Sequence, residues 1–185
     1  EKTLRYDRQA LVLIPEISLT PQTEKRFRDR FNVPIVTLHS GLTDKNRLAA
    51  WTSAKTGEAR IILGTRSAIF TPLCQPGLII VDEEHDQSYK QHEGFRYSAR
   101  DLAVIRARRE NISIILGSAT PSIESLNNCV ADRYQHLVLT DRAGKAVQPT
   151  WSIVDLKNEQ CEAGIAASTL AKIRLTVEQG QQVLV

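Results

Sequence analysis

Short runs of apolar residues recur along the chain and are separated by stretches with helical periodicity. The runs cover residues 10–14, 35–38, 61–63, 78–81, 112–116 and 136–139. Apolar side chains occupy consecutive positions in these runs, which is typical of strands that are buried on both faces. Because such strands alternate with helices, the pattern predicts an α/β fold in which a parallel sheet carries helices on both faces.

Two helices are predicted in the first half of the chain. Thr20 is expected to cap the first, which starts at Pro21, where a missing N–H costs nothing, and ends near residue 31. The second starts near Thr43, ends at Gly57 as an expected left-handed residue, and has an apolar face formed by Leu48 and Trp51.

Two more helices are predicted in the second half of the first 140 residues. Ser98 is expected to cap one of them, with Asp101 three positions on in a capping-box-like arrangement. Its core-facing residues are predicted to be Leu102 and Ile105. The dipeptide Thr-Pro at residues 120–121 is expected to open the other, shorter helix.

After the sixth apolar run, the alternation of apolar strands and helical stretches becomes less regular. Residues 141–160 form a predicted connector that is interrupted by one short strand at 152–156. A helix from Ser168 to Gly180 follows, and then a strand at 183–185. We therefore predict a first lobe in residues 1–140, a connector in 141–167, and the opening of a second lobe in 168–185.

Composition narrows the class of protein. Of the 185 residues, 42 % are apolar and 24 % are charged, which excludes a disordered chain. No apolar run approaches the roughly 20 residues of a membrane span. The net charge of +3 is too small for a dedicated DNA-binding domain. The chain lacks Met and stops within a predicted strand, so we expect it to be an internal piece of a longer protein.

The three cysteines are far apart, at positions 74, 129 and 161, and none belongs to a Cys-x-x-Cys pair. An odd number of cysteines without a secretion signal favours reduced thiols in a cytoplasmic protein. A zinc site within these residues is not expected, because zinc sites need several ligands at short spacing.

The clearest chemical signal is the acidic run Asp82, Glu83 and Glu84, followed by His85, directly after the apolar run 78–81. A buried strand places Asp82 at the carboxyl edge of the sheet, where α/β proteins bind ligands. There a carboxylate can hold a Mg²⁺-bound water, as in a Walker B motif, and Glu83 can orient or deprotonate an attacking water. The alternative is a solvated acidic corner that caps a helix.

Two other strand ends carry polar residues at the same edge. Residues 117–120, Gly-Ser-Ala-Thr, could bridge the acidic run to a nucleic-acid path, or form only a turn and a helix cap. Residues 64–67, Gly-Thr-Arg-Ser, suit a phosphate oxygen, although many turns have this composition.

Aromatic and basic residues are interleaved in residues 86–97, a composition typical of a surface that stacks single-stranded bases. Alternatively, these aromatic side chains pack back onto the core. The stretch contains Tyr89, Lys90, His92, Phe95, Arg96 and Tyr97. Several common motifs are missing from the sequence: the P-loop G-x-x-x-x-G-K-[ST], the dinucleotide fingerprint G-x-G-x-x-G and the metalloprotease H-E-x-x-H.

In this order, the segments resemble the superfamily 2 DNA helicases and, more closely, the bacterial replication-restart helicases. The resemblance is carried by residues 13–22, 38–42, 64–72, 82–91, 96–101 and 117–121. It implies a RecA-like fold and an ATP-dependent 3′–5′ helicase that restarts replication at stalled forks in the bacterial cytoplasm. It also implies ATP and Mg²⁺ as cofactors, and as partners single-stranded and forked DNA, primosome proteins and single-strand DNA-binding protein.

The resemblance also implies a role for each matching residue. Asp82 would hold Mg²⁺ through water, Glu83 would act on the attacking water, and His85 would relay the nucleotide state. ATP hydrolysis would be coupled to unwinding through Glu84, Ser118 and Thr120. DNA would be contacted by Pro15, Glu16, Thr20, Thr65, Arg66, Tyr89, Lys90, Phe95, Arg96 and Tyr97.

The rest of such a helicase is expected outside these residues. The Walker A segment and the DNA-binding N-terminal region would precede Glu1, and the second lobe, its arginine finger and a zinc-binding cysteine cluster would follow Val185. The chain alone is therefore expected to be inactive. Two alternatives stay open: another superfamily 2 motor, such as an RNA or restriction helicase, and a nucleic-acid-binding α/β module whose acidic run is vestigial.

Overall fold

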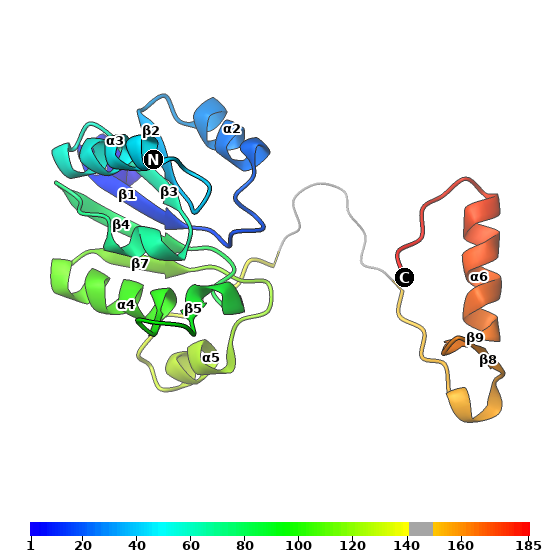
Figure 1. Cartoon of the computed structure of the whole chain (residues 1–185). Coiled ribbons are helices and arrows are strands. Elements are labelled where there is room, and N and C mark those ends of the chain that lie inside the picture. Colours follow the sequence, from blue (N-terminus) through cyan, green and yellow to red (C-terminus); the bar gives the residue numbers. More distant parts are fainter. Residues whose placement is uncertain (141–149) are drawn as a thin grey trace. The chain divides into compact units, whose positions relative to one another are not determined.

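A computed structural model describes residues 1–140 and 150–185 of the chain, which form two compact units, residues 1–136 and 137–185 (Figure 1). The first unit is built on a five-stranded, fully parallel sheet with the strand order β2-β3-β1-β4-β7. Its strands are β1 Gln9–Leu13, β2 Ile35–Leu38, β3 Ile61–Gly64, β4 Pro76–Val81 and β7 Ser113–Leu116. The first five apolar runs are therefore confirmed as strands of the predicted α/β sheet.

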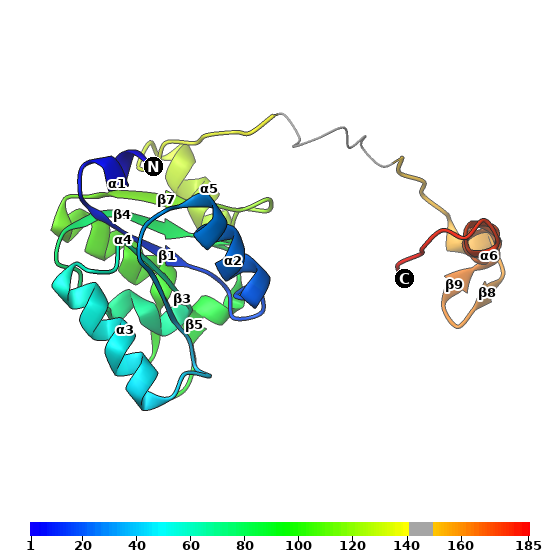
Figure 2. The same ribbon diagram turned by 90° about the horizontal axis from the view of Figure 1, so that it is seen from above.

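Both faces of this sheet are covered, which explains why the strands are continuously apolar. Successive residues of β1 point to opposite cores: Leu11 and Leu13 belong to one, Val12 and Ile14 to the other. The first core is completed by α3 and α4, and the second by α1 and α2, which lie on either side of the sheet (Figure 2). The helices of this unit are α1 Lys2–Arg5, α2 Pro21–Arg30, α3 Asp44–Thr56, α4 Ala99–Glu110 and α5 Ile123–Val130.

Three of the predicted helix starts are confirmed by their hydrogen bonds. The side chains of Thr20, Thr43 and Ser98 each accept a hydrogen bond from the backbone N–H three residues on, at the starts of α2, α3 and α4. The end of α3 is also as predicted, since Gly57 has a left-handed φ of 84°. The fourth start is wrong: α5 is capped by Ser122, whose hydroxyl accepts from the Ser125 N–H, and not by Thr120.

The predicted core faces of α3 and α4 are only partly correct. Leu48 is 65 % exposed and Trp51 39 %, while Ala54 is the residue of α3 that is fully buried. In α4, Leu102 packs against the core but Ile105 is 49 % exposed. The buried face of α4 consists of Ala99, Ala103 and Ala107. Small side chains let the backbone of a helix lie close to the sheet. The bulkier residues of α4 therefore lie to the sides of this contact.

The predicted strands in the last third of the chain are wrong. Residues 136–139, 152–156 and 183–185 contain no strand. The second unit instead has a short turn of helix at Leu156–Asn158, an antiparallel pair of strands, β8 Cys161–Glu162 and β9 Ile165–Ala166, and the predicted helix α6 Ala167–Glu178. The remaining connector residues, 141–149, lie outside the described residues.

Three short elements near the functional edge were not predicted. One is a 3-10 helix, η1 Arg66–Phe70, which follows β3 directly, and a second is η2 Gln87–Tyr89. The third is a small antiparallel hairpin formed by β5 Lys90–Gln91 and β6 Tyr97–Ser98. Among the described residues, no helix has the length and apolar character that crossing a membrane requires.

Candidate active site at the carboxyl edge of the sheet

Polar residues follow each strand at the carboxyl edge of the parallel sheet. Glu16 lies just beyond β1, Ser40 beyond β2, Thr65 beyond β3, Asp82 beyond β4 and Ser118 beyond β7. Parallel strands place these ends on one side, so segments far apart in the sequence meet there. The parallel topology thus brings these residues to one edge of the sheet.

Asp82 is exposed at the end of the central strand pair. Its backbone N–H donates to the Leu13 carbonyl at 2.9 Å, which extends the sheet register by one residue. Its carbonyl accepts from the Tyr89 hydroxyl at 2.7 Å, and its Oδ1 accepts from the Glu83 N–H at 3.1 Å. The backbone of Asp82 is therefore fixed, while its carboxylate faces solvent.

This carboxylate fits a Mg²⁺ ion that keeps most of its water ligands. Within residues 1–140 and 150–185, no three His, Cys, Asp or Glu side chains converge on a point where they could hold a metal. Mg²⁺ dehydrates reluctantly and is commonly bound through one or two carboxylates together with substrate phosphates. A single oxygen donor at the sheet edge matches that preference.

Glu83 has a left-handed backbone with φ of 46°. For a residue with a side chain, this conformation costs on the order of 1–3 kcal/mol and is concentrated at functional sites. The sharp turn directs Glu83 and Glu84 differently: the Glu83 side chain stays 43 % exposed, whereas Glu84 is buried. Glu83 Oε2 lies 3.6 Å from His85 Nδ1.

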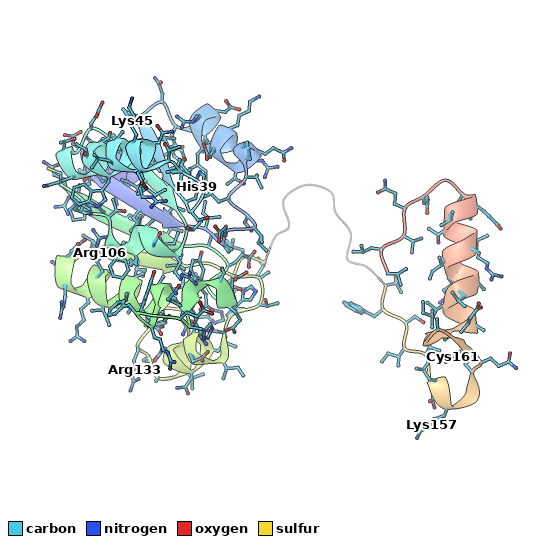
Figure 3. All side chains as sticks on the ribbon, in the orientation of Figure 1. His39, Lys45, Arg106, Arg133, Lys157 and Cys161 are labelled. Atoms are coloured by element: carbon cyan, nitrogen blue, oxygen red, sulfur yellow. The ribbon has the colours of Figure 1, made fainter. Side chains whose placement is uncertain are left out.

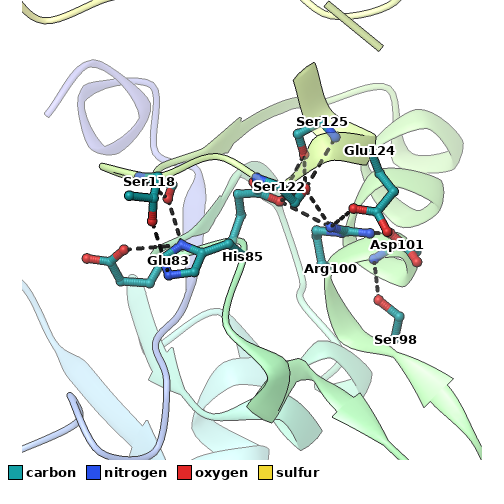
Figure 4. Close-up of polar contacts among 11 residues, drawn as sticks. Glu83, His85, Ser98, Arg100, Asp101, Ser118, Ser122, Glu124 and Ser125 are labelled. Atoms are coloured by element: carbon teal, nitrogen blue, oxygen red, sulfur yellow. Dashed lines mark hydrogen bonds and ion pairs between the residues drawn. The ribbon is translucent and has the colours of Figure 1, made fainter. Parts of the chain in front are cut away.

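His85 connects the acidic run to the segment after β7. Its Nδ1 lies 2.7 Å from the Ser118 hydroxyl, and its Nε2 lies 3.5 Å from the Thr120 hydroxyl (Figure 4). The Ser118 hydroxyl also accepts from the Thr120 N–H at 3.0 Å. The structure therefore brings His85, which was predicted to relay the nucleotide state, into contact with Ser118 and Thr120, which were predicted to couple hydrolysis to unwinding.

Glu84 is the buried acid of the run. Its carboxylate accepts hydrogen bonds from the Ser122 N–H at 2.6 Å, the Ser122 and Ser125 hydroxyls at 3.0 and 2.8 Å, and Arg100 Nη1 at 3.3 Å. Burial raises the pKa of Glu84, but the hydrogen bonds from Ser122, Ser125 and Arg100 outweigh it and lower the pKa below its ordinary value. Glu84 is thus ionised and fully satisfied.

A groove of about 350 Å³ opens between the segments that follow β1, β2 and β3 and the hairpin of β5 and β6. The Ser40 hydroxyl donates to the Glu16 carboxylate at one of its walls. Five of the residues predicted to contact DNA line this groove: Glu16, Thr65, Arg66, Phe95 and Tyr97. The other lining residues are Ser40, Ser67, Ser88 and Gln91. Figure 3 shows the side chains of the first unit as sticks on its ribbon.

Aromatic rings line the hairpin side of the groove. The Tyr97 ring packs edge-on against Phe70, with centroids 5.0 Å apart, and lies 5.8 Å from Phe95. Phe95 is 76 % exposed, and its neighbour Arg96 is exposed as well. This is the arrangement expected of a stacking surface, an exposed ring supported from behind by others.

Arg66 binds the backbone where η2 joins β5. Its Nη1 donates to the backbone carbonyls of Ser88 and Lys90, at 3.2 and 3.0 Å. Thr65, the preceding residue, is 7 % exposed, and its N–H donates to the Leu38 carbonyl. These two residues hold the groove wall in place.

Four other residues that were predicted to contact DNA also lie in the scaffold. Tyr89 is 1 % exposed, and burial together with the charge of Asp82 raises the pKa of its hydroxyl. Its ring belongs to the first core, as the alternative interpretation of the aromatic segment anticipated. Pro15 is buried, and Thr20 uses its hydroxyl to cap α2. Lys90 is half-buried in β5.

The sequence interpretation missed several residues of this edge. Ser40 could have been found because it follows a predicted strand end, as Asp82 does. Arg100, Ser122 and Ser125 gave no such signal, since their contacts with Glu84 span 16 to 41 residues of sequence. A contact of that range follows from the fold and not from local spacing.

Comparison with known proteins gives two findings. The chain matches the DEAD/DEAH box helicase family over residues 2–129. It is also similar to curated proteins described as "Replication restart protein PriA": it is 50 % identical to that of Haemophilus influenzae over 184 residues, 39 % to that of Bacillus subtilis over 185, and 46 % to that of Synechocystis over 156. These alignments cover 100 %, 98 % and 80 % of this chain, but only 25 %, 23 % and 18 % of the relatives. The chain thus spans about a quarter of their length.

Proposed function

The chain belongs to the DEAD/DEAH box helicase family, whose domains bind ATP, and on that premise we propose that it is part of a DNA helicase of the replication-restart type. The observation that carries the proposal is the contact of His85 with Ser118 and Thr120. It joins the acidic run to the segment after β7 on the same sheet edge as an aromatic groove. A nucleotide-driven motor needs this kind of link between its nucleotide site and its nucleic-acid site.

In the proposed reaction, Asp82 is the residue that would hold a Mg²⁺ ion, through a water ligand. When bound, Mg²⁺ neutralises the charge that develops on the transferred phosphoryl group. The exposed carboxylate of Asp82 on a rigid backbone suits this role. Its position is fixed from both sides, by the Leu13 carbonyl and by the Tyr89 hydroxyl.

Glu83 is the proposed base. Its side chain is half-exposed beside Asp82, where it can orient an attacking water and accept the proton of that water. The left-handed turn at Glu83 aims this carboxylate outward while the next one, of Glu84, is turned inward. The turn therefore separates a reactive acid from a structural one.

The groove is the proposed DNA site. Phe95, supported by Tyr97, offers an exposed ring on which a single-stranded base can stack, and the exposed Arg96 offers a cation for a phosphate. Arg66 contributes by holding the hairpin through the Ser88 and Lys90 carbonyls. DNA that moves this hairpin would act on Asp82 through the Tyr89 hydroxyl.

For the whole protein we propose the activity that the name of the relatives indicates, restart of replication, with forked DNA as substrate. Primosome proteins and single-strand DNA-binding protein are the proposed partners in the bacterial cytoplasm, and zinc is the proposed metal of a part outside these residues. The support is 50 % identity over 184 residues to one such relative.

The test is the ATPase activity of the full-length protein with and without single-stranded DNA. DNA is expected to stimulate hydrolysis, Asp82→Asn to abolish it, and Glu83→Gln to lower kcat about a hundredfold or more. Asp29→Asn, a change of the same chemistry on the exposed side of α2, is expected to leave kcat unchanged. Stimulation by single-stranded RNA alone would indicate an RNA motor, and no Asp82-dependent ATPase would indicate a binding module without catalysis.

A further inference from the structure

Glu84 holds both ends of the segment that carries Ser118 and Thr120. At the start of this segment, the Glu84 N–H donates to the Gly117 carbonyl at 2.9 Å. At its end, the Ser122 N–H donates to the Glu84 carboxylate at 2.6 Å. Residues 117–122 are therefore clamped to the end of β4 by one residue, and the adjacent His85 contacts the middle of the segment.

Arg100, which lies in a third element, stabilises the contact between Glu84 and the end of residues 117–122. It lies in the first turn of α4, and its side chain is 11 % exposed. Its Nη1 donates to the Glu84 carboxylate at 3.3 Å and to the Ser122 hydroxyl at 2.9 Å, while its Nε donates to Asp101 at 2.8 Å (Figure 4). The guanidinium thus binds the acid and the end of the clamped segment at the same time.

The buried location makes these contacts directional and strong. Glu84 has a 2 % exposed side chain, so its charge cannot be satisfied by water if a partner is lost. The planar fork of Arg100 can serve two acceptors at fixed angles, which a lysine ammonium does not reproduce. The position of residues 117–122 relative to His85 therefore depends on Arg100.

We infer that Arg100 is a positioning residue: through Glu84 and Ser122 it holds residues 117–122 against His85 and so sets how strongly DNA stimulates ATP hydrolysis. The inference rests on the proposed function. It assigns no contact with nucleotide or DNA to Arg100. It also gives each acid of the run a separate role: Asp82 would bind the metal, Glu83 would act on the attacking water, and Glu84 would hold residues 117–122 against His85.

The experiment compares two arginines of α4 in the full-length protein. Arg100→Gln removes the positioning contacts, whereas Arg106→Gln is the matched control. Arg106 is 16 % exposed and ties α4 to the Ile69 and Thr71 carbonyls at 2.7 and 2.8 Å, away from Glu84 (Figure 3). Both variants lose buried arginine contacts, so both are expected to melt at lower temperature.

Only Arg100→Gln is expected to change coupling. The ratio of DNA-stimulated to DNA-independent kcat should fall about tenfold, while KM for ATP stays within about twofold. Arg100→Lys, which keeps the charge without the fork, should recover part of the ratio. Because Arg106 contacts η1, which carries Arg66 of the groove wall, the ratios are compared at saturating DNA, where Arg106→Gln should keep the wild-type ratio at temperatures at which it is folded.

The inference is overturned if the two Gln variants change the ratio equally, or if Arg100→Gln keeps the wild-type ratio. Should Arg100→Gln fail to fold, Ser125→Ala decides the question, because it removes one hydrogen bond to Glu84 and no charge. An unchanged ratio in Ser125→Ala would then contradict the inference, and a reduced one would support it. Asp82→Asn tests the proposed function separately, since that variant must lose the DNA-stimulated ATPase whether or not Arg100 matters.

Discussion

Among single residues, Glu84 shows how a buried carboxylate can be kept charged. Four hydrogen bonds converge on its two oxygens from Ser122, Ser125 and Arg100. Together they overcome the penalty of burial and lower the pKa below the ordinary value of 4.5. The stability of the first unit is therefore linked to the ionisation of this group.

The pH dependence of unfolding follows from this shift. Because the pKa of Glu84 is lower when folded, its charge stabilises the fold above the unfolded pKa of 4.5, and this contribution is lost as pH falls through the folded pKa. Glu84→Gln should cost about 2–3 kcal/mol at pH 7, and the difference from wild type should shrink below about pH 4.5. Urea unfolding of the 185-residue chain at several pH values measures it.

Glu93→Gln is the control, because Glu93 is exposed at the hairpin loop. It should track the wild type at every pH. A Glu84→Gln variant whose deficit is constant between pH 7 and pH 3 would show that ionisation of Glu84 does not stabilise the fold.

The location of a residue could be predicted from the sequence where the end of a strand determines it. Asp82, His85 and Ser118 were all found because an apolar run precedes a polar group. The individual roles were harder to predict, since Thr65 and Tyr89 proved to be buried. A sequence shows that a residue lies at an edge, but the turn that follows, such as the left-handed one at Glu83, decides which way its side chain points.

At the scale of elements, α4 packs on the sheet through small residues. Ala99, Ala103 and Ala107 are at most 1 % exposed, while Ile105 is 49 % exposed. Hydrophobicity alone predicted that Leu102 and Ile105 face the core, and this prediction is correct only for Leu102. The buried face of α4 is determined by how closely the helix backbone can approach the sheet and not by the size of the apolar side chain.

This packing predicts effects of different size for two substitutions in α4. Ala103→Leu forces three extra carbon atoms into a filled core and should destabilise the fold by about 1–3 kcal/mol. Ile105→Ala removes the same number of carbon atoms but from an exposed position, and should cost less than about 1 kcal/mol. Urea unfolding curves of both variants provide the test, and a larger loss for Ile105→Ala would refute the packing argument.

The turn from β3 into η1 depends on a glycine. A Cβ at Gly64 would lie 2.3 Å from the Ala68 Cβ and 2.9 Å from the Leu38 carbonyl oxygen. Gly64→Ala must therefore displace η1, which carries Arg66, or the adjacent strand β2. The expected result is a loss of stability of about 2 kcal/mol or more and weaker binding of single-stranded DNA in the full-length protein.

Gly117→Ala is the matched substitution at another strand end. There the added Cβ would be 3.8 Å from its nearest neighbours, Asp82 Oδ1 and the Val81 carbonyl, which is ordinary van der Waals contact. It should leave stability within about 0.5 kcal/mol of wild type. Equal melting temperatures for the two alanine variants would show that β3 and η1 do not need the close approach.

The apolar runs that were wrongly predicted as strands have no partner strand in the described residues. Leu137, Val138 and Leu139 are apolar in sequence but 68–96 % exposed in the structure. An apolar run becomes a strand only where a neighbouring strand and a covering face accept it. The five runs of the first unit meet that condition in one sheet, and the runs in the second unit do not.

For the whole molecule, the chemistry is concentrated in the first unit. Residues 1–136 contain the acidic run, the clamped segment and the groove, and the small net charge of +3 fits a local DNA track better than a broad basic surface. The assignment of residues 141–167 to a connector and 168–185 to a second lobe stays a prediction. The sequence contains no G-x-x-x-x-G-K-[ST] segment to cradle phosphates.

The 185-residue chain should accordingly bind single-stranded DNA without hydrolysing ATP. Phosphoryl transfer needs a phosphate cradle and a metal site together, so no ATPase is expected from the chain alone. The groove is intact in it, and labelled single-stranded DNA should bind weakly, with an affinity that falls as salt increases. Fluorescence anisotropy and a phosphate-release assay on the same sample measure both quantities.

The aromatic part of this binding can be isolated with one variant and one control. Phe95→Ala should weaken binding by about tenfold, because stacking of a base on an aromatic ring contributes on the order of 1–3 kcal/mol. Tyr6→Ala removes an aromatic ring that is 70 % exposed, at the end of α1 that leads into the amino end of β1, and should leave the affinity unchanged. Equal losses from the two variants would place the DNA elsewhere than the groove. Phosphate release that disappears in Asp82→Asn would show that the chain alone hydrolyses ATP without a P-loop.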